Sequence, residues 1–208
     1  MSQTDEQPAK VEPEDLSHHR RLLEGMAQAV AARGYADTTI ADVVREAGVS
    51  RRTFYEHFST KAECLVALYA AASHNALNVL RESIDPGQAW QAQVERALTA
   101  YLGFLARSPV LMRTLYVEIL GLGRDGLLAR RRVNQEIADF MIGVINCPNP
   151  GGDEKHALAP EMAMAIVGGI NELVLQYIER GHVEHLGELV KPASLLVRAV
   201  THSEGRNA

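Results

Sequence analysis

Aromatic residues are scarce in this chain, and the alternating apolar–polar pattern of strands is missing. Aromatics make up 5% of the 208 residues, whereas hydrophobic residues make up 47%. Ala, Leu and Val are abundant, and this composition favours helices over strands. We therefore predict an all-α fold, because no run of residues alternates with the period of two that a half-buried strand requires.

Cysteines and long apolar runs are also few. The two cysteines, Cys64 and Cys147, predict two free thiols in a reducing compartment, with a bridge between them as the lesser alternative. No apolar run reaches the ~20 residues that span a bilayer, and the N-terminus lacks the pattern of a signal peptide. We expect a cytoplasmic protein with no membrane partner.

Motifs for catalysis are absent. The glycines of "GLGRDG" (121–126) follow no predicted strand, so they are not a nucleotide-binding fingerprint, and no nucleophile elbow, zinc-protease helix or cysteine–histidine pair is present. His182 and His185 stand near Glu188, but further metal ligands are lacking. We predict no enzyme activity, no cofactor and no metal site.

Charge and composition divide the chain into three parts. Residues 1–15 are polar and acidic, and we expect a disordered tail. Residues 16–62 carry seven Lys or Arg against five acids and form the only net basic part of a chain whose net charge is −5. Residues 63–208 contain longer helical patterns, over about 88–107, 109–121, 124–146, 159–180 and 184–202, with a long flexible loop at 147–155. The basic surplus alone is weak evidence for a polyanionic partner.

Three short helices are expected in the basic part, over about 17–33, 40–47 and 51–58, and Gly34 follows the first of them as a stop signal. Gly48-Val49-Ser50 makes a tight turn between the second and third, which is the helix-turn-helix arrangement. Phe54 and Phe58 are four residues apart, so both fall on the inward face of the third helix. The outward face then presents donors and flat rings to a partner.

Each outward group suits a contact with double-stranded DNA. Arg51 or Arg52 can bond guanine, and the Thr53 methyl can touch a thymine methyl. Tyr55 and His57 can donate to phosphates. Two further positions lie at helix starts: Thr39 is an expected N-cap near the DNA backbone, and Lys61 is in the first turn of the next helix, where amide groups also favour phosphate.

The segment "TTIADVVREAGVSRRTFYEHFSTKAECL" resembles the DNA-binding part of the TetR family of bacterial transcriptional regulators. The resemblance covers about residues 17–65 and rests on the combination of A-G-V-S with T-[FL]-Y-x-H-F-x-[ST]-K. It implies an N-terminal DNA-binding domain, a larger helical domain that dimerises and binds a small molecule, and a set of DNA contacts. By position these contacts fall on Thr39, Ser50, Arg51, Arg52, Thr53, Tyr55, His57 and Lys61.

Glu56 departs from the family pattern, which often has an aromatic residue there. An acid at this position repels phosphate unless it faces a cytosine amino group or pairs with Arg52, four residues earlier. Both alternatives stay open at the level of sequence.

The larger part has two helices that are apolar around much of their circumference, about 159–180 and 184–202. Such helices can pack on their own domain with one face and on a second copy with another. Gly168-Gly169 permits close helix approach, and Pro192 marks a helix start or kink. We expect a homodimer through these two helices, as the resemblance also implies, with a monomer core as the alternative.

An effector cavity is expected between the basic part and these helices. Residues suited to an apolar lining with a few polar groups are Trp90, Tyr101, Phe104, Met112, Tyr116, Glu118, Phe140, Met141, Met164 and Asn171. Ordinary core packing explains each of them at least as simply. Glu118 suits a cationic ligand or a solvent-facing position.

The function that follows is a ligand-responsive repressor, which binds a palindromic operator as a dimer and is released by a small-molecule effector. An activator or a regulator without a ligand fits the same residues. A helical enzyme or carrier with a vestigial DNA-binding head is the rival from another class.

Overall fold

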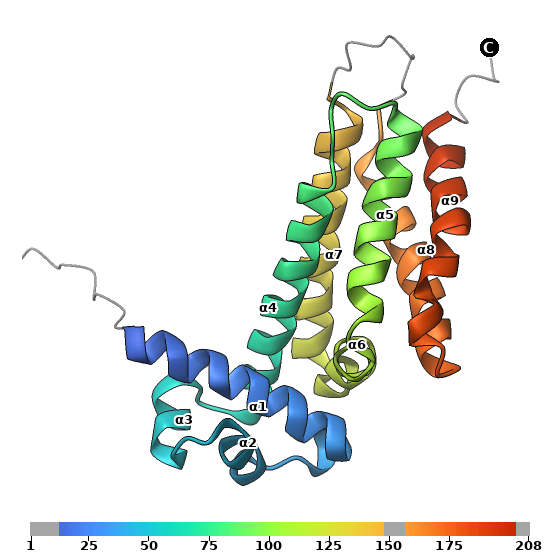
Figure 1. Ribbon diagram of the computed structural model, residues 1–208. Helices are drawn as coiled ribbons and strands as arrows, with labels where there is room; N and C mark the ends of the chain where they lie inside the picture. Colours follow the sequence, from blue (N-terminus) through green and yellow to red (C-terminus); the bar gives the residue numbers. More distant parts are fainter. Residues whose placement is uncertain (1–12, 148–156, 203–208) are drawn as a thin grey trace, which may run out of the picture. The chain divides into compact units, whose positions relative to one another are not determined.

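The structure is a computed structural model that describes residues 13–147 and 157–202. In these ranges every regular element is a helix, as the composition predicts. The chain divides into two compact units, Met1–Leu68 and Tyr69–Ala208 (Figure 1). Each unit has its own buried core.

The first unit contains three helices and the start of a fourth. They are α1 (Pro13–Asp37), α2 (Ile40–Ala47), α3 (Arg51–His57) and the first turns of α4 (Lys61–Glu82). α1 packs against both α2 and α3. The side chains that fill this core are apolar and come from all four helices and the link after α3: Leu22, Met26, Val30, Val43, Ala47, Phe54, Phe58, Cys64 and Leu65.

α1 is longer than the sequence pattern predicts. It begins at Pro13, within the stretch expected to be a tail, and residues 1–12 of that stretch lie outside the described chain. Gly34 was expected to end the helix, and it does leave the helical conformation, with φ 77° and ψ 161°. A short helical segment follows this kink as far as Asp37.

Gly25 marks the closest approach of α1 to α2. A β-carbon at this position would lie 2.7 Å from both the Val43 carbonyl oxygen and the Ala47 amide nitrogen. Both atoms belong to the backbone of α2 and cannot move aside without moving the helix. The missing side chain therefore sets the separation of the two helices.

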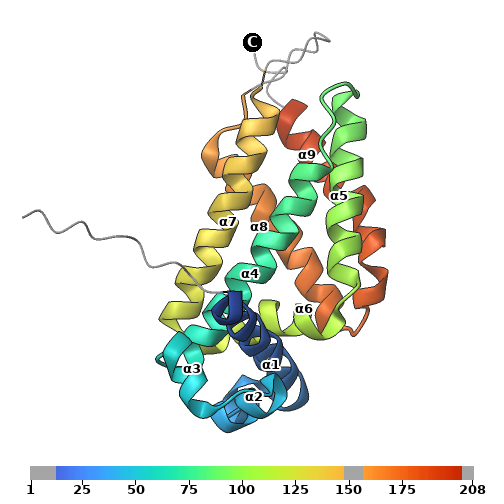
Figure 2. The same ribbon diagram turned by 60° about the vertical axis from the view of Figure 1, so that its left-hand side comes forward.

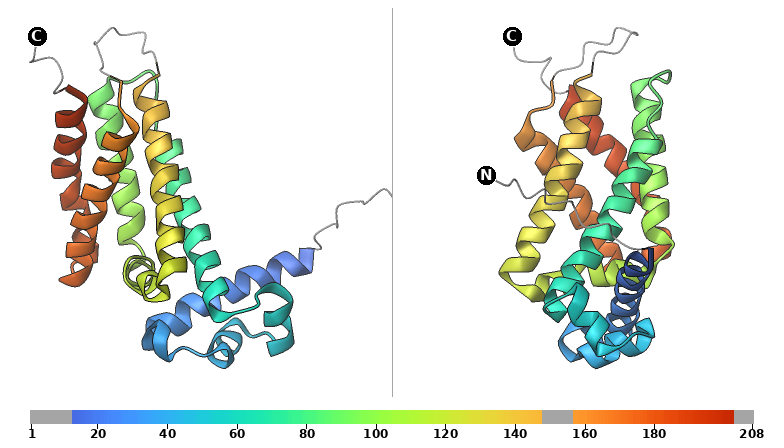
Figure 3. Two further views of the ribbon diagram at one scale, coloured as in Figure 1. Left: turned by 180° about the vertical axis from the view of Figure 1, so that it is seen from behind. Right: turned by 90° about the vertical axis from the view of Figure 1, so that its left-hand side faces the viewer.

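The second unit is built from α5 (Trp90–Ala106), α6 (Pro109–Tyr116), α7 (Arg124–Ile145), α8 (Pro160–Glu179) and α9 (Val190–His202), with the later turns of α4. Figures 2 and 3 show α5, α7, α8 and α9 running beside one another. Large side chains that are fully buried in this unit include Leu77, Leu102, Met112, Ile119, Ile166, Val174 and Leu186.

Two predicted helices are each divided in the structure. The segment expected as 109–121 ends its α-helix at Tyr116 and continues as the 3-10 helix η1 (Glu118–Leu122). The segment expected as 184–202 begins as the 3-10 helix η2 (Val183–Leu189), and α9 starts only at Val190. Pro192 lies in the first turn of α9, where its missing N–H leaves no bond unmade.

Cys64 and Cys147 are both free, and burial raises the pKa of the Cys64 thiol to about 12. No helix in the described part of the chain combines the length and apolar character that crossing a bilayer demands. The expected loop at 147–155 falls almost wholly outside the described residues.

Candidate nucleic-acid interface and effector cavity

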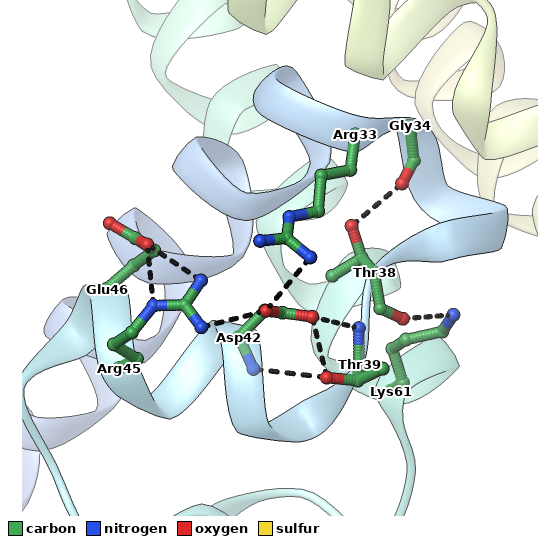
Figure 4. Close-up of polar contacts among 8 residues, drawn as sticks. All are labelled: Arg33, Gly34, Thr38, Thr39, Asp42, Arg45, Glu46 and Lys61. Atoms are coloured by element: carbon green, nitrogen blue, oxygen red, sulfur yellow. Dashed lines mark hydrogen bonds and ion pairs between the residues drawn. The ribbon is translucent and has the colours of Figure 1, made fainter.

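The start of α2 is fixed by a capping box between Thr39 and Asp42. The Thr39 hydroxyl accepts a hydrogen bond from the Asp42 amide at 3.2 Å, and the Asp42 carboxylate accepts one from the Thr39 amide at 3.0 Å (Figure 4). Thr39 is thus the N-cap that the sequence predicts. Two orphan amide groups are satisfied, and the orientation of α2 at its N-terminus is defined.

Asp42 also forms ion pairs with two arginines. Arg45 lies 2.9 Å and Arg33 3.5 Å from its carboxylate, so the N-terminus of α2 is tied to α1 through Arg33 (Figure 4). The hydrogen bonds from Thr39, reinforced by these arginines, lower the pKa of Asp42 from 3.8 to about 2. The carboxylate therefore stays ionised and in place well into the acid range.

We expect Thr39→Ala to lower the free energy of unfolding by about 1 kcal/mol, the usual value of an N-cap. Asp42→Asn should destabilise in a pH-dependent way. Because the pKa of Asp42 in the folded chain lies below its ordinary value of 3.8, its carboxylate stabilises the fold above that pH. This contribution is lost as the pH falls towards about 2.

The measurement is the urea midpoint of the full chain, followed by circular dichroism at about pH 6, 4 and 2.5, which spans the titration of the carboxylate. The difference between wild type and Asp42→Asn should shrink across this series. A difference that stays constant or grows on acidification would contradict the role given to Asp42.

The turn between α2 and α3 depends on Gly48 and Arg21. Gly48 adopts the left-handed conformation, with φ 60° and ψ 38°, which ends α2 and reverses the chain. Arg21 of α1 donates to the carbonyl oxygens of Ala47 at 3.0 Å and Gly48 at 2.6 Å. A cation is thus held at the C-terminus of α2, where the helix dipole favours it.

α3 begins at a second cap and is anchored by two rings. The Ser50 hydroxyl accepts from the Thr53 amide at 3.0 Å. Phe54 is completely buried and Phe58 nearly so, with ring centroids 5.8 Å apart. The predicted inward face of α3 is therefore correct, and the helix is held rigidly on the core.

The opposite side of α3 faces solvent. Arg51 and Arg52 are exposed, as is half of Tyr55. The Arg51 guanidinium lies 5.9 Å from the centroid of the Tyr55 ring. Ser50 and Thr53 complete this recognition surface, which we define as Ser50, Arg51, Arg52, Thr53 and Tyr55. It is short and rich in donors, as direct readout in a major groove requires.

Glu56 pairs with Arg52. The Arg52 Nε lies 3.0 Å from the Glu56 carboxylate, and the Arg52 side chain is 89% exposed. Of the two arrangements left open by the sequence, this is the ion pair within the helix. The pair neutralises the acid while leaving the other guanidinium nitrogens of Arg52 outside it.

His57 does not face outward, in contrast to the sequence prediction. Its side chain is only 9% exposed and lies 3.3 Å from the Asp15 carboxylate of α1. Its ring centroid is 5.9 Å from that of His19. Burial, followed by the nearby His57, lowers the pKa of His19. The reason is helical geometry: position 57 lies next to the buried Phe58 on the side that meets α1.

Lys61 is also more enclosed than expected. Its ammonium donates to the carbonyl oxygens of Thr38 at 2.6 Å and Tyr35 at 2.8 Å, and it lies 4.2 Å from the Tyr35 ring centroid. These carbonyls belong to the last turn of α1 and the link to α2, and Figure 4 shows the contact with Thr38. Lys61 therefore fastens α4 to this corner of the first unit, and its phosphate contact stays a prediction.

The second unit contains an apolar cavity of about 80 Å³. α4, α5, α7, α8 and α9 all contribute to its wall. The lining is mostly apolar, with few polar side chains among the described residues, and it includes Trp90, Leu98, Phe140, Met141 and Val167. The volume exceeds what a single water needs several-fold, so the cavity has room for an apolar ligand.

A second cavity, of about 40 Å³, shares Tyr101, Ile137 and Asn171 with the first. Part of its wall is polar. Tyr116 donates to the Asn171 side-chain oxygen at 3.2 Å, and Asn171 donates to Asn134 at 3.0 Å. Burial raises the pKa of Tyr101 and raises that of Tyr116 well above the ordinary value. Both phenols therefore remain protonated, and Tyr116 already uses its proton in the bond to Asn171.

Seven of the ten residues predicted to line a cavity are found in these walls: Trp90, Tyr101, Met112, Tyr116, Phe140, Met141 and Asn171. Phe104, Glu118 and Met164 line neither cavity. Sequence reasoning missed Tyr69 and Arg130, which both line the polar cavity. Arg130 is the first of three successive arginines on α7, and helical period distinguishes it because it falls on the stripe of Asn134 and Ile137.

Comparison with known proteins agrees with this architecture. Residues 22–68 match the family described as "Bacterial regulatory proteins, tetR family". The HTH-type transcriptional regulator SrpR of Pseudomonas putida is 30% identical over 117 residues, 55% of this chain and 52% of SrpR. The chain thus matches about half the length of SrpR. The uncharacterized HTH-type transcriptional regulator TtgW, also from P. putida, is 29% identical over 60% of this chain and 90% of its own.

A solved structure shares the fold along most of the chain. The transcriptional regulator FadR from Bacillus subtilis, in complex with stearoyl-CoA, superposes with a TM-score of 0.75. It is 15% identical, and the match covers 88% of this chain and 98% of FadR. At this identity the likeness establishes the all-α fold alone.

Proposed function

Because the chain belongs to the TetR family of bacterial regulatory proteins, we propose that this transcriptional regulator is a repressor. It binds a palindromic operator in double-stranded DNA as a homodimer, and a small-molecule effector in the second unit releases it. The recognition surface of α3 carries this proposal. A buried Phe54 on one side and exposed Arg51, Arg52 and Tyr55 on the other make α3 a rigid reading element.

The outward side chains divide by task. Arg52 and Thr53 address base edges in the major groove, where an arginine reads guanine and a methyl group reads thymine. Ser50, Arg51 and Tyr55 flank them and address phosphates, which fix register but carry no sequence information. Thr39 stands at the N-terminus of α2, whose amides add a further anion-favouring site.

Support for the dimer comes from α8 and α9. Leu195 on α9 is 55% exposed and Met162 on α8 is 43% exposed. A β-carbon at Gly168 would have no heavy atom within 4 Å, whereas one at Gly169 would lie 3.1 Å from the Leu196 side chain of α9. Gly169 therefore serves packing within the unit, and the open side of α8 at Gly168 is free for a second copy.

Effector control requires that the ligand favour one state of the dimer over the other. Weakening DNA binding about 100-fold takes about 2.7 kcal/mol of coupling free energy. α4 is suited to transmit it, because its residues 61–68 belong to the first unit while Tyr69, Ala72 and Leu80 line the cavities of the second. A ligand that shifts α4 shifts the element that Lys61 fastens.

Lys61→Met should separate two roles for this lysine. If Lys61 only holds the carbonyls of Tyr35 and Thr38, the substitution lowers the melting temperature of the first unit and leaves the salt slope of DNA binding unchanged. If Lys61 also contacts a phosphate, the slope of log affinity against log salt concentration should in addition be reduced by about 1. We expect the fall in melting temperature together with the reduced slope, measured by anisotropy on one duplex between about 50 and 200 mM salt. An unchanged slope would remove Lys61 from the DNA contacts.

The test of the proposed function is footprinting on the DNA that flanks the gene of this protein. We expect protection of a two-fold symmetric site with half-site centres about 34 Å apart. Transcription from that DNA in vitro should fall when the protein is added. A rise in transcription would favour an activator, and no protection by a folded dimer at moderate salt would refute the proposal.

A further inference from the structure

The two cavities of the second unit are neighbours that share Tyr101, Ile137 and Asn171, and we treat them as the two parts of one site. Along α7 the polar cavity is lined by Arg130, Val133, Asn134 and Ile137, and the apolar cavity by Ile137, Phe140, Met141, Val144 and Ile145. The lining thus changes from polar to apolar in the direction of the chain. At 1.5 Å per residue, the stripe from Arg130 to Ile145 is about 22 Å long.

The lining residues of two other helices, α4 and α5, change from polar to apolar in the same direction. Tyr69 and Ser73 of α4 line the polar cavity, while Leu80 and Ile84 beyond them line the apolar one. On α5, which runs the opposite way, Leu105 lines the polar cavity and Trp90 the apolar one, with Tyr101 shared. The residues of α4, α5 and α7 therefore all place the polar lining at the same end of the site.

Arg130 is the charge of this site. Among the residues that the structure describes, no acid lines either cavity, and no carboxylate forms an ion pair with Arg130. A half-buried guanidinium without a counter-ion is costly, and an anion that enters the cavity removes that cost. Glu118 lines neither cavity, so the structure does not support the cationic ligand that this residue suggested.

Protonated phenols surround the same point. Burial raises the pKa of Tyr69 to about 12 and keeps Tyr116 protonated, and Arg130 only partly offsets these shifts in pKa. The Tyr69 hydroxyl can donate to an oxyanion alongside the guanidinium, whereas the Tyr116 hydroxyl already donates to Asn171. The side-chain amides of Asn134 and Asn171 already bond to each other, so they brace the wall of the cavity.

We propose that the effector is a small amphipathic monoanion. Its carboxylate-like group is bound by Arg130 with the Tyr69 hydroxyl, and its apolar body lies between Trp90, Phe140 and Met141. The inference deepens the proposed effector site and rests on that proposed function for its regulatory meaning. The binding event itself requires only the second unit.

Trp90 supplies a built-in reporter. It is the single tryptophan of the chain and lines the apolar cavity, so a ligand that fills the cavity changes its fluorescence. The probes are three compounds with the same chain length and different head groups: octanoate, octanamide and octylammonium. We expect saturable binding of octanoate at least about tenfold tighter than octanamide, and no saturable response to octylammonium.

The matched variants are on α7. Arg130→Gln should weaken octanoate about tenfold or more and leave octanamide unchanged, and Arg130→Lys should fall between because it keeps the charge but loses the planar fork. Arg131→Gln, at the exposed neighbour that lines neither cavity, should match wild type. Circular dichroism of each variant verifies its fold.

Several outcomes would overturn the inference. They are equal affinities for octanoate and octanamide, preference for octylammonium, no saturable Trp90 response to any of the three, or an Arg130→Gln variant that is folded and binds octanoate normally. None of these outcomes depends on DNA binding, which is measured separately with the operator. Conversely, a chain that binds octanoate through Arg130 but binds no DNA refutes the proposed function and leaves this ligand class standing.

Discussion

Gly25→Ala is expected to abolish operator binding while leaving the second unit folded. The added β-carbon would stand 2.7 Å from backbone atoms of Val43 and Ala47, so α1 and α2 must separate. Overpacking of this kind costs about 1–3 kcal/mol, and it outweighs the gain in helix propensity of up to about 1 kcal/mol that replacing a helical glycine brings. α3 packs on α1, so the recognition surface loses its support.

The matched control is Gly143→Ala on α7. Gly143 is a helical glycine with no heavy atom within 4 Å of an added β-carbon, so alanine should be neutral or slightly stabilising there. Thermal unfolding by circular dichroism and the affinity for the operator are measured for both variants. A Gly25→Ala protein that melts and binds like wild type would show that the tight α1–α2 contact is not required.

Arg52→Ala is expected to weaken operator binding by about 5- to 150-fold, the range for losing one arginine–base contact of about 1–3 kcal/mol. Two effects combine. The guanidinium that we propose reads a base is lost, and Glu56, which pairs with Arg52 at 3.0 Å, is left as an unpaired acid on the recognition surface. Base preference should relax at one position of each half-site.

The double variant Arg52→Ala/Glu56→Gln separates these effects. If the freed acid contributes to the loss, removing its charge should restore part of the affinity, and Glu56→Gln alone should bind as well as wild type or better. The affinities of wild type, the two single variants and the double variant, measured by anisotropy at one fixed salt concentration, form a double-mutant cycle. A double variant no better than Arg52→Ala would mean that Glu56 is inert at the interface.

The helix-turn-helix was predictable because its determinants are local. Thr39, Gly48 and Ser50 are capping and turn residues whose roles depend only on neighbours in sequence, and the four-residue spacing of Phe54 and Phe58 fixes the inward face of α3. The structure confirms each of these. The Arg52–Glu56 pair was one of two arrangements that spacing alone allowed.

The partners of His57 and Lys61 within the first unit could not be predicted, because they come from distant residues. His57 meets Asp15 and His19 of α1, and Lys61 meets carbonyl oxygens at the far end of the same helix and just beyond it. No spacing rule brings these groups together. Residue type suggested a phosphate contact in both cases, and those contacts stay predictions. The structure adds that each side chain also has partners within the first unit.

The cavity was predictable in kind but not in detail. Bulky and aromatic residues indicated an apolar lining, yet which of them face inward depends on how five helices pack, and Phe104 and Met164 fall outside it. Arg130 was missed because two further arginines follow it, and such a run resembles a solvated surface. Helical period places Arg130 on the stripe of Asn134 and Ile137, but the packing around α7 is needed to show that this stripe lines a cavity.

The most direct test of the central claim, that α3 reads a DNA sequence, is the specificity ratio of the intact protein. Affinity for the protected operator is compared with affinity for a scrambled duplex of equal length and composition, at one physiological salt concentration. We predict that the operator binds at least about 1,000-fold more tightly, and that Arg52→Ala lowers this ratio. Equal affinities for the two duplexes would contradict the account.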